Sequence, residues 1–281
     1  MRSCGHVLAL HGWLDNCESF HHLAPLMAAA GHHVVAVDLP GHGLSDHLPR
    51  GLVYHDVDNV LMIHTLVTGR GWGRVSLVGH SMGGGLCQLF AATFPHMVDK
   101  VVMIDITHMP RRPITPDNVV ERINKCVQSF QTVSDKEQRV FQSMDECVQR
   151  KLRPPFQIPG LDMTSTLTPD AARILCQRGV KSSKDGLLLT RDIRLNLPNL
   201  ERLSVEDHLE IAKHIKCPQL IIEYADFPRE HFNDDILTTL KTSNPLLKYH
   251  ELEGTHHGHL NDPKPTNDLI LDFMSVSKCK L

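Results

Sequence analysis

The sequence predicts an α/β protein, with a mostly parallel sheet flanked by helices and one inserted helical cap. Apolar runs of strand length alternate with helix-spaced apolar patterns over the first hundred residues, and again after Cys217. Between these parts the strand pattern gives way to amphipathic helical pieces. A chain of 281 residues is long enough for one core with an insertion. We predict a first part of the core at residues 1–106, the cap at 107–207 and a second part of the core at 208–281.

Each predicted element has its own local signal. Glycine favours a helix end because it adopts the left-handed conformation without strain, and proline cannot continue a helix. Accordingly, helices are expected at 19–31 and 56–69, each ending on glycine, and at 85–94, which Pro95 follows. The amphipathic run at 118–130 predicts a cap helix. Six short apolar runs predict buried strands, at residues 6–12, 32–41, 74–80, 100–106, 218–226 and 246–254.

The overall composition excludes several classes of protein. A net charge of −3 and a pI near 6.7 leave no electrostatic footprint for nucleic acid or an anionic membrane. No apolar run reaches the length of a membrane span. The eight cysteines are scattered without a C-x-x-C pair, which favours reduced thiols in an intracellular protein. We therefore expect neither a nucleic-acid partner nor a membrane span.

Four glycines surround one serine in RVSLVGHSMGGG, between a predicted strand and a predicted helix. Glycine loses more backbone freedom on folding than any other residue, so this cluster needs a structural reason. The spacing matches neither a phosphate-binding loop, which requires a following lysine, nor a dinucleotide fingerprint. It does match G-x-S-x-G at residues 79–83, in the strand–turn–helix context of a nucleophile elbow. This predicts Ser81 as a nucleophile and the backbone N–H of Met82 as a donor to a developing oxyanion.

An elbow serine also needs a second oxyanion donor and a base. The loop after the first predicted strand offers the backbone N–H of Trp13 as that donor. The base comes late in the chain order serine, acid, histidine, and residues 252–260 hold three histidines. These histidines could instead form a metal site, although nothing in the spacing specifies a further ligand. We predict His256 as the base and His259 as a neighbour lining the pocket, with no metal.

Taken together, these motifs resemble those of the α/β-hydrolases, and most those of the serine hydrolase-like proteins. The resemblance is carried by H-G-W-x-D-N at 11–16, D-x-P-G-H-G-x-S at 38–45, G-H-S-M-G-G at 79–84 and E-G-T-H-H-G-H-L at 253–260. With the cap included, it extends over nearly the whole chain. It implies the same roles for the predicted nucleophile, base and oxyanion donors. It also implies that residues 38–45 form a structural turn near the site.

The resemblance leaves two candidates for the acid that orients the histidine. Many family members carry it after the strand that follows the cap, which here corresponds to Asp226. Others, including esterases with an I-D-I signature, carry it at the end of the strand after the elbow helix, which corresponds to Asp105. Asp105 lies next to the predicted cap, where a carboxylate would be buried, and a catalytic role would explain its burial. Asp226 could equally be an ordinary residue of an exposed loop. We favour Asp105 and keep Asp226 as the alternative.

The type of nucleophile indicates the reaction. Epoxide hydrolases and haloalkane dehalogenases of this fold use a carboxylate at the elbow, so serine favours acyl transfer. We predict hydrolysis of an ester or thioester of a small or apolar acyl group through an acyl-enzyme, with no cofactor. The apolar helical faces of the cap favour an apolar acyl or alcohol group. Two alternatives remain, namely C–C bond hydrolysis by the same serine and a catalytically silent binding protein of this fold.

The two ends of the sequence give further expectations. The fold usually begins with two extra strands, whereas here the first strand starts at His6, so that hairpin is expected to be missing. Its loss predicts that the strand at 32–41 forms an exposed sheet edge. The last residues, Cys279-Lys280-Leu281, are a variant of the S-K-L peroxisomal address. They predict a peroxisomal import receptor as a partner, with the cytoplasm as the alternative location.

Overall fold

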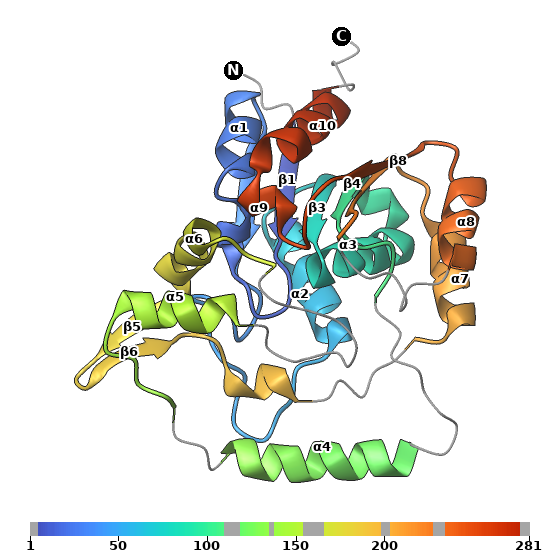
Figure 1. Cartoon of the computed structure of the whole chain (residues 1–281). Coiled ribbons are helices and arrows are strands. Elements are labelled where there is room, and N and C mark those ends of the chain that lie inside the picture. The colour runs from blue at the N-terminus through green and yellow to red at the C-terminus, as the bar shows by residue number, and fades with distance from the viewer. Residues whose placement is uncertain are drawn as a thin grey trace.

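Six parallel strands form the central sheet, in the order β2-β1-β3-β4-β7-β8 (Figure 1). They belong to a computed structural model that describes residues 5–109, 119–134, 138–153, 166–197, 203–226 and 234–275. All six predicted strands are present, and the mostly parallel sheet is confirmed. Their bounds are β1 (His6–Leu10), β2 (His33–Val37), β3 (Val75–His80), β4 (Val98–Ile104), β7 (Gln219–Tyr224) and β8 (Leu247–Leu252).

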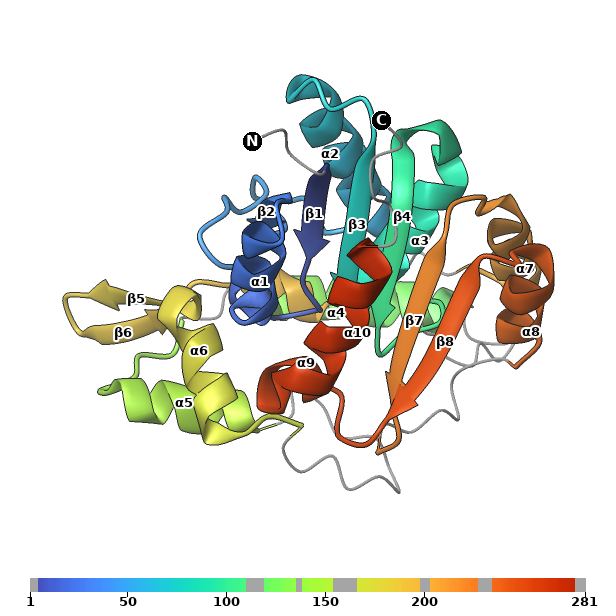
Figure 2. The same ribbon diagram turned by 90° about the horizontal axis from the view of Figure 1, so that it is seen from above.

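Helices cover both faces of the sheet (Figure 2). Successive strand residues point to opposite faces, so Val7 and Ala9 belong to one apolar cluster, and Leu8 and Leu10 to the other. The first cluster includes side chains of α1 (Leu23–Ala29) and α10 (Pro263–Ser275), together with the short helix η1 (Cys17–Phe20). The second includes side chains of α2 (Asp56–Gly69), α3 (Met82–Thr93), α7 (Val205–His214) and α8 (Asp234–Ser243).

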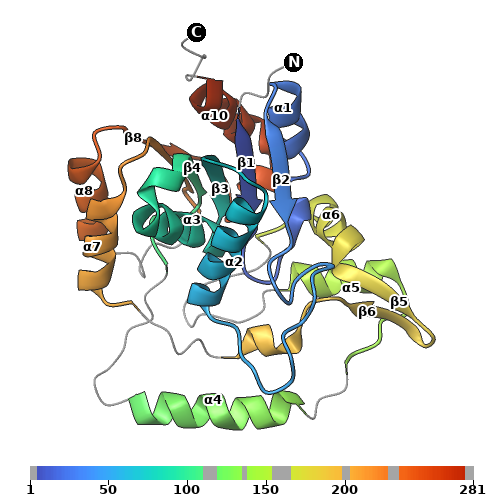
Figure 3. The ribbon, with the colours of Figure 1, turned by 180° about the vertical axis from the view of Figure 1, so that it is seen from behind.

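The cap lies between β4 and α7 and has its own apolar cluster. It was predicted to be helical, and the structure adds an antiparallel hairpin that projects from the body (Figure 3). Helix α7 begins at Val205, before the predicted end of the cap, and it packs against α3 and α8. The described cap elements are α4 (Val119–Ser134), α5 (Met144–Leu152), α6 (Pro169–Gly179), β5 (Val180–Ser183), β6 (Gly186–Leu189) and η4 (Ile193–Asn196).

Strand β2 forms one edge of the sheet and pairs with β1 alone among the described strands. Beside this edge lies a shallow hollow lined partly by Val37, Leu44, Met62 and Leu66. This is the strand that the sequence predicted at an exposed edge. In the part of the chain that the structure describes, no helix is long and apolar enough to cross a bilayer.

The carboxyl ends of the parallel strands meet along one edge of the sheet. The loops that leave β1, β3, β4, β7 and β8 there carry Trp13, Ser81, Asp105, Asp226 and His256 respectively. Ligands of open α/β sheets bind at this edge. The fold therefore brings every predicted site residue to one edge, and side-chain geometry decides which of them interact.

Candidate active site

Ser81 occupies a strained turn between β3 and α3. Its backbone has φ 51° and ψ −123°, a conformation that a non-glycine residue rarely adopts. A Cβ atom on Gly79 would lie 2.3 Å from the Gly83 carbonyl oxygen, and one on Gly83 would lie 2.0 Å from the Leu10 carbonyl oxygen. Only glycine fits at these two positions, because the turn packs backbone against backbone. Backbone contacts at the elbow therefore explain why glycine is required at positions 79 and 83.

The imidazole of His256 lies between the Ser81 hydroxyl and the Asp105 carboxylate. Nε2 of His256 is 2.9 Å from Ser81 Oγ, and Nδ1 is 2.5 Å from Asp105 Oδ2. Because a carboxylate only accepts, Nδ1 carries the proton and Nε2 keeps a lone pair for the serine hydroxyl. The histidine side chain is 16% exposed and the aspartate side chain 2%. The arrangement joins a reachable hydroxyl to a buried carboxylate through one ring.

Asp105 follows β4 directly and is held by the neighbouring strand. Its φ is 53°, and its backbone N–H donates to the Ile222 carbonyl at 2.6 Å. The second carboxylate oxygen, Oδ1, accepts the backbone N–H of Tyr224 at 2.8 Å. Asp226, the alternative acid, lies in the turn after β7 with its side chain exposed. Of these two aspartates, the structure brings Asp105 and not Asp226 into contact with His256.

The loop that carries Trp13 lies directly against the elbow. A Cβ atom on Gly12 would be 3.3 Å from Ser81 Cβ, so the peptide that joins Gly12 to Trp13 borders the serine. A tight turn follows, in which the Asp15 N–H donates to the Gly12 carbonyl at 3.1 Å. Met82 is the first residue of α3, at the positive end of the helix dipole. Both predicted oxyanion donors therefore lie next to Ser81, and their role remains a prediction.

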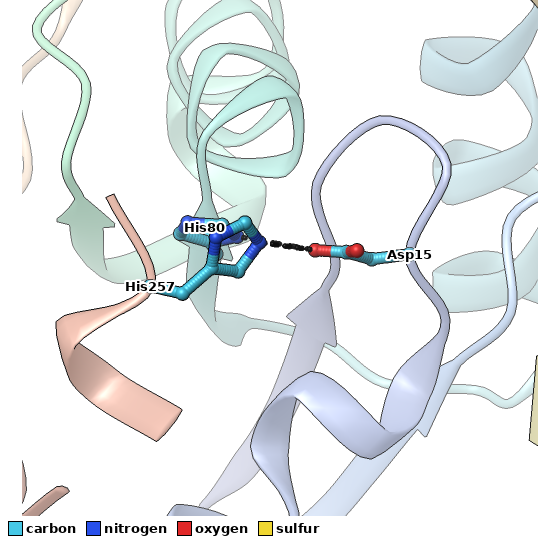
Figure 4. A group of neighbouring side chains, drawn as sticks. All are labelled: Asp15, His80 and His257. Carbon is cyan, nitrogen blue, oxygen red and sulfur yellow. Dashed lines mark hydrogen bonds and ion pairs between the residues drawn. The ribbon is translucent and has the colours of Figure 1, made fainter. Parts of the chain in front are cut away.

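Beside His256 lies a polar cluster of Asp15 and His80, which are buried, and His257, which is partly buried (Figure 4). Nε2 of His257 is 3.2 Å from Asp15 Oδ2, and Nε2–H of His80 donates to the His256 carbonyl at 2.8 Å. Nδ1 of His80 is 3.8 Å from Asp15 Oδ2 and has no hydrogen-bond partner among the described residues. His259 is also buried, and its ring lies 4.1 Å from that of His80. Asp15, His80 and His257 belong to three separate sequence motifs, and nothing in those motifs predicted that their side chains would be in contact.

Burial sets the protonation states of this cluster. It holds the pKa of His80 well below its usual value, and the neighbouring His259, His256 and His257 lower it further. Burial also lowers the pKa of His257, so both rings are neutral. For Asp15, burial alone would raise the pKa, but the Lys151 ammonium and His257 hold it well below its usual value. The cluster therefore holds one carboxylate, one ammonium group and neutral imidazoles.

This cluster also has the donor atoms of a metal site. Asp15, His80 and His257 offer one oxygen and two nitrogens within 4.8 Å of one another, a set that three-ligand zinc sites use. However, Nζ of Lys151 lies 2.6 Å from Asp15 Oδ1 and already balances its charge. A divalent cation on the other oxygen would lie beside an ammonium group in a buried site, where like charges repel strongly. The residues fit an internal hydrogen-bond network better than a metal.

The fold and the elbow together define an α/β-hydrolase. A family model described as "alpha/beta hydrolase fold" matches residues 5–152, and the chain belongs to that family. It is 31% identical over 274 residues to the "Serine hydrolase-like protein" of Danio rerio, covering 95% of this chain and 81% of the relative. It is 33% identical over 277 residues to the "Probable serine hydrolase" of Drosophila melanogaster, covering 95% and 80%.

A solved structure supports the same assignment. The hypothetical protein of Pseudomonas aeruginosa has a TM-score of 0.82 and 28% identity to this chain, covering 96% of this chain and 92% of its own. The predicted family and fold class are therefore confirmed, and the broad assignment as a hydrolase follows from them.

Proposed function

We propose that the protein is a serine hydrolase that cleaves an ester or thioester of a small or apolar acyl group. The observation that carries this proposal is the hydrogen-bonded line from Ser81 through His256 to Asp105 at a nucleophile elbow. A serine hydroxyl is a weak nucleophile until an adjacent base takes its proton, and that base must itself be oriented by a third group. All three groups are in reach of one another.

The proposed reaction has two halves. Oγ of Ser81 attacks the substrate carbonyl carbon while Nε2 of His256 takes the hydroxyl proton. The backbone N–H groups of Trp13 and Met82 bind the oxyanion of the tetrahedral intermediate. When the intermediate collapses, the His256 imidazolium gives its proton to the leaving alcohol or thiol, and an acyl-serine remains. Water then attacks the acyl-serine with His256 again as base, which releases the acid and restores the serine.

Asp105 has a positioning and electrostatic role in this proposal. By accepting the Nδ1 proton it fixes the tautomer of His256, and its negative charge stabilises the imidazolium that forms in each half. The backbone N–H of Tyr224 and the Nδ1–H of His256 both donate to this carboxylate, which holds it in place. This arrangement requires no cofactor.

Labelling with a fluorescent alkyl fluorophosphonate tests the proposal, since such a probe reacts with a serine already activated by its base. We expect the purified protein to label and Ser81→Ala not to label. Ester turnover is expected to fall on the order of 10⁶-fold in this variant, as in other serine triads. A circular dichroism spectrum and melting curve like those of the wild type would show that the variant is folded.

The outcome separates the remaining alternatives. If a folded wild-type sample does not label, the catalytically silent binding protein replaces the hydrolase. If it labels, turnover of acyl esters and thioesters of increasing chain length would define the substrate class. Labelling without turnover of any of them would favour C–C bond hydrolysis by the same serine.

The location of the protein is a separate proposal. Cys279-Lys280-Leu281 lie outside the described residues, so the peroxisomal address rests on the sequence alone. We propose recognition by a peroxisomal import receptor. A fluorescent reporter that ends in this tripeptide should collect in peroxisomes, and a diffuse cytoplasmic signal would contradict the proposal.

A further inference from the structure

The turn that carries His256 is held by the cap as well as by the core. Two groups of the turn reach the Thr166 carbonyl, Thr255 Oγ1 at 2.7 Å and Asn261 Nδ2 at 2.8 Å. In return, the backbone N–H of Thr168 donates to Asn261 Oδ1 at 2.9 Å. Leu260, four residues after His256, packs in the apolar cluster of the cap. The segment that carries His256 is therefore hydrogen-bonded to the cap and packed against it.

A second connection runs through a charged side chain of α5. Nζ of Lys151 donates to Asp15 Oδ1 at 2.6 Å and to the Leu14 carbonyl at 2.9 Å. The other oxygen of Asp15 accepts from Nε2 of His257 at 3.2 Å, and Nδ1 of His257 pairs with Thr166 Oγ1 at 2.8 Å. A single buried carboxylate thus joins a cation of the cap to the residue that follows the base. Figure 4 shows the Asp15–His257 half of this link.

This network also reaches the elbow. His80, the residue before the nucleophile, donates Nε2–H to the His256 carbonyl and faces Asp15 with its other ring nitrogen. Asp15 and His80 are buried, at 4% and 1% exposure, so their contacts are not screened by solvent. The main chain of the base is fixed from two directions, by the elbow through His80 and by the cap through His257.

We propose that Lys151, Asp15 and His257 are positioning residues that set His256 against Ser81 when the cap is seated. This inference rests on the proposed function, in which His256 is the base. A group far from the reacting atoms can change the rate strongly, because a displacement of about 1 Å at the base can cost about 10²-fold. The cap would then control the activity of the base in addition to any contact with substrate.

The chain offers a matched control for this inference. Arg178 of α6 forms a second ion pair between cap and core, with Nε 2.6 Å from Asp38 Oδ2. The closest approach equals that of the Lys151 pair, and the acidic partner is buried in both cases. Asp38 lies beside β2, and no contact of the described residues joins it to His256 directly. If loss of an ion pair acts only by loosening the cap, removing either pair should lower the activity equally. If Lys151 positions His256, only the loss of Lys151 should lower it.

The experiment compares Lys151→Met, Lys151→Arg and Arg178→Met with the wild type. The first readout is fluorophosphonate labelling, resolved into the rate at saturation and the probe concentration for half-saturation. For Lys151→Met we expect the rate at saturation to fall roughly tenfold or more, with the half-saturation concentration unchanged. Arginine keeps the charge and should restore most of the rate, and Arg178→Met should stay near wild type. The second readout is amide hydrogen exchange of peptides that cover residues 253–262, which we expect to quicken in Lys151→Met alone.

Several outcomes would overturn the proposal. These are an unchanged rate in Lys151→Met, an equal loss in Arg178→Met, and no recovery in Lys151→Arg. A labelling rate that is lost on dialysis against a chelator and restored by zinc would overturn it too, by making the cluster a metal site. Should the wild type not label, the proposed function fails, yet hydrogen exchange still tests the connection between cap and turn. Quicker exchange in Lys151→Met alone would support that connection, and equal exchange in all variants would reject it.

Discussion

The carboxyl ends of β4 and β7 offer a comparison within one sheet. The two strands are paired neighbours, with Ile104 opposite Ile222, and each is followed within two residues by an aspartate. Asp105 has a positive φ and is buried, whereas Asp226 is exposed in the turn after β7. Position at a strand end therefore does not identify the acid. The two candidates differ in burial and in the backbone N–H that Asp105 accepts from the next strand, which lowers the cost of burying its charge.

Replacing the two acids is expected to give the largest contrast. Asp105→Asn should lower kcat on the order of 10⁴-fold, because an amide offers the wrong tautomeric partner to His256. Asp226→Asn, the matched control at the neighbouring strand, should leave kcat near wild type. Steady-state hydrolysis of a p-nitrophenyl ester measures both. A larger loss from Asp226→Asn would reverse the assignment of the acid.

Steric pressure on the end of β7 should give an intermediate effect. A Cβ atom on Gly258 would lie 2.3 Å from the ring of Tyr224, whose backbone N–H holds Asp105. Overpacking of this kind costs about 1–3 kcal/mol, so Gly258→Ala should lower the melting temperature and the labelling rate together.

Gly69→Ala serves as the control for this substitution. An added Cβ there meets nothing within 4 Å, and the residue lies at the end of α2 with ordinary φ. Equal melting temperatures for Gly258→Ala and Gly69→Ala would show that Tyr224 moves aside at no cost, which would contradict the expected overpacking.

The weakest expected effect concerns acid pH and the buried ring of His42. His42 accepts the Leu14 N–H on Nε2 and pairs through Nδ1 with the Pro40 carbonyl, so it must be neutral. Burial lowers its pKa from 6.5 to about 3, and nearby His11 adds to the lowering. Between these values the unfolded chain binds a proton that the native state excludes. The contribution of His42 to stability therefore rises with pH across this window and is lost as pH falls below 6.5, by up to about 1.4 kcal/mol per pH unit.

Urea unfolding at pH 7.5 and pH 5.5 measures this dependence. His42→Gln removes one titrating ring and should reduce the slope, while Gly69→Ala, which removes no titrating group, should leave it unaltered. The same slope in His42→Gln and wild type would show that the other buried histidines account for the acid sensitivity.

The sequence was sufficient for the elements whose signal is local. The apolar runs predicted the six sheet strands, and the glycine spacing predicted the sharp turn at Ser81, because backbone collisions there leave no choice of residue. The acid could not be decided, since Asp105 and Asp226 differ in burial and burial depends on packing distant in sequence.

Two features of the structure went unpredicted. The hairpin β5–β6 was missed because its strands are four residues long and without apolar alternation, although the Asp185-Gly186 pair is a turn signal. The contact of Asp15 with His257 and Lys151 was missed because these residues lie far apart in the chain. No local pattern reports that such residues converge.

The loop that carries Trp13, described above for its place beside the elbow, also makes the cap observable by fluorescence. The indole Nε1–H of Trp13 donates to the Leu195 carbonyl at 2.8 Å, and Leu195 belongs to η4 of the cap. The chain has only one other tryptophan, Trp72, which is 7% exposed and stacks on His6. A Trp72→Phe protein would therefore carry a single tryptophan, at the junction of cap and elbow. Its emission would shift to the red whenever the cap lifts and water reaches the ring, which would let the opening of the cap be followed in solution without substrate.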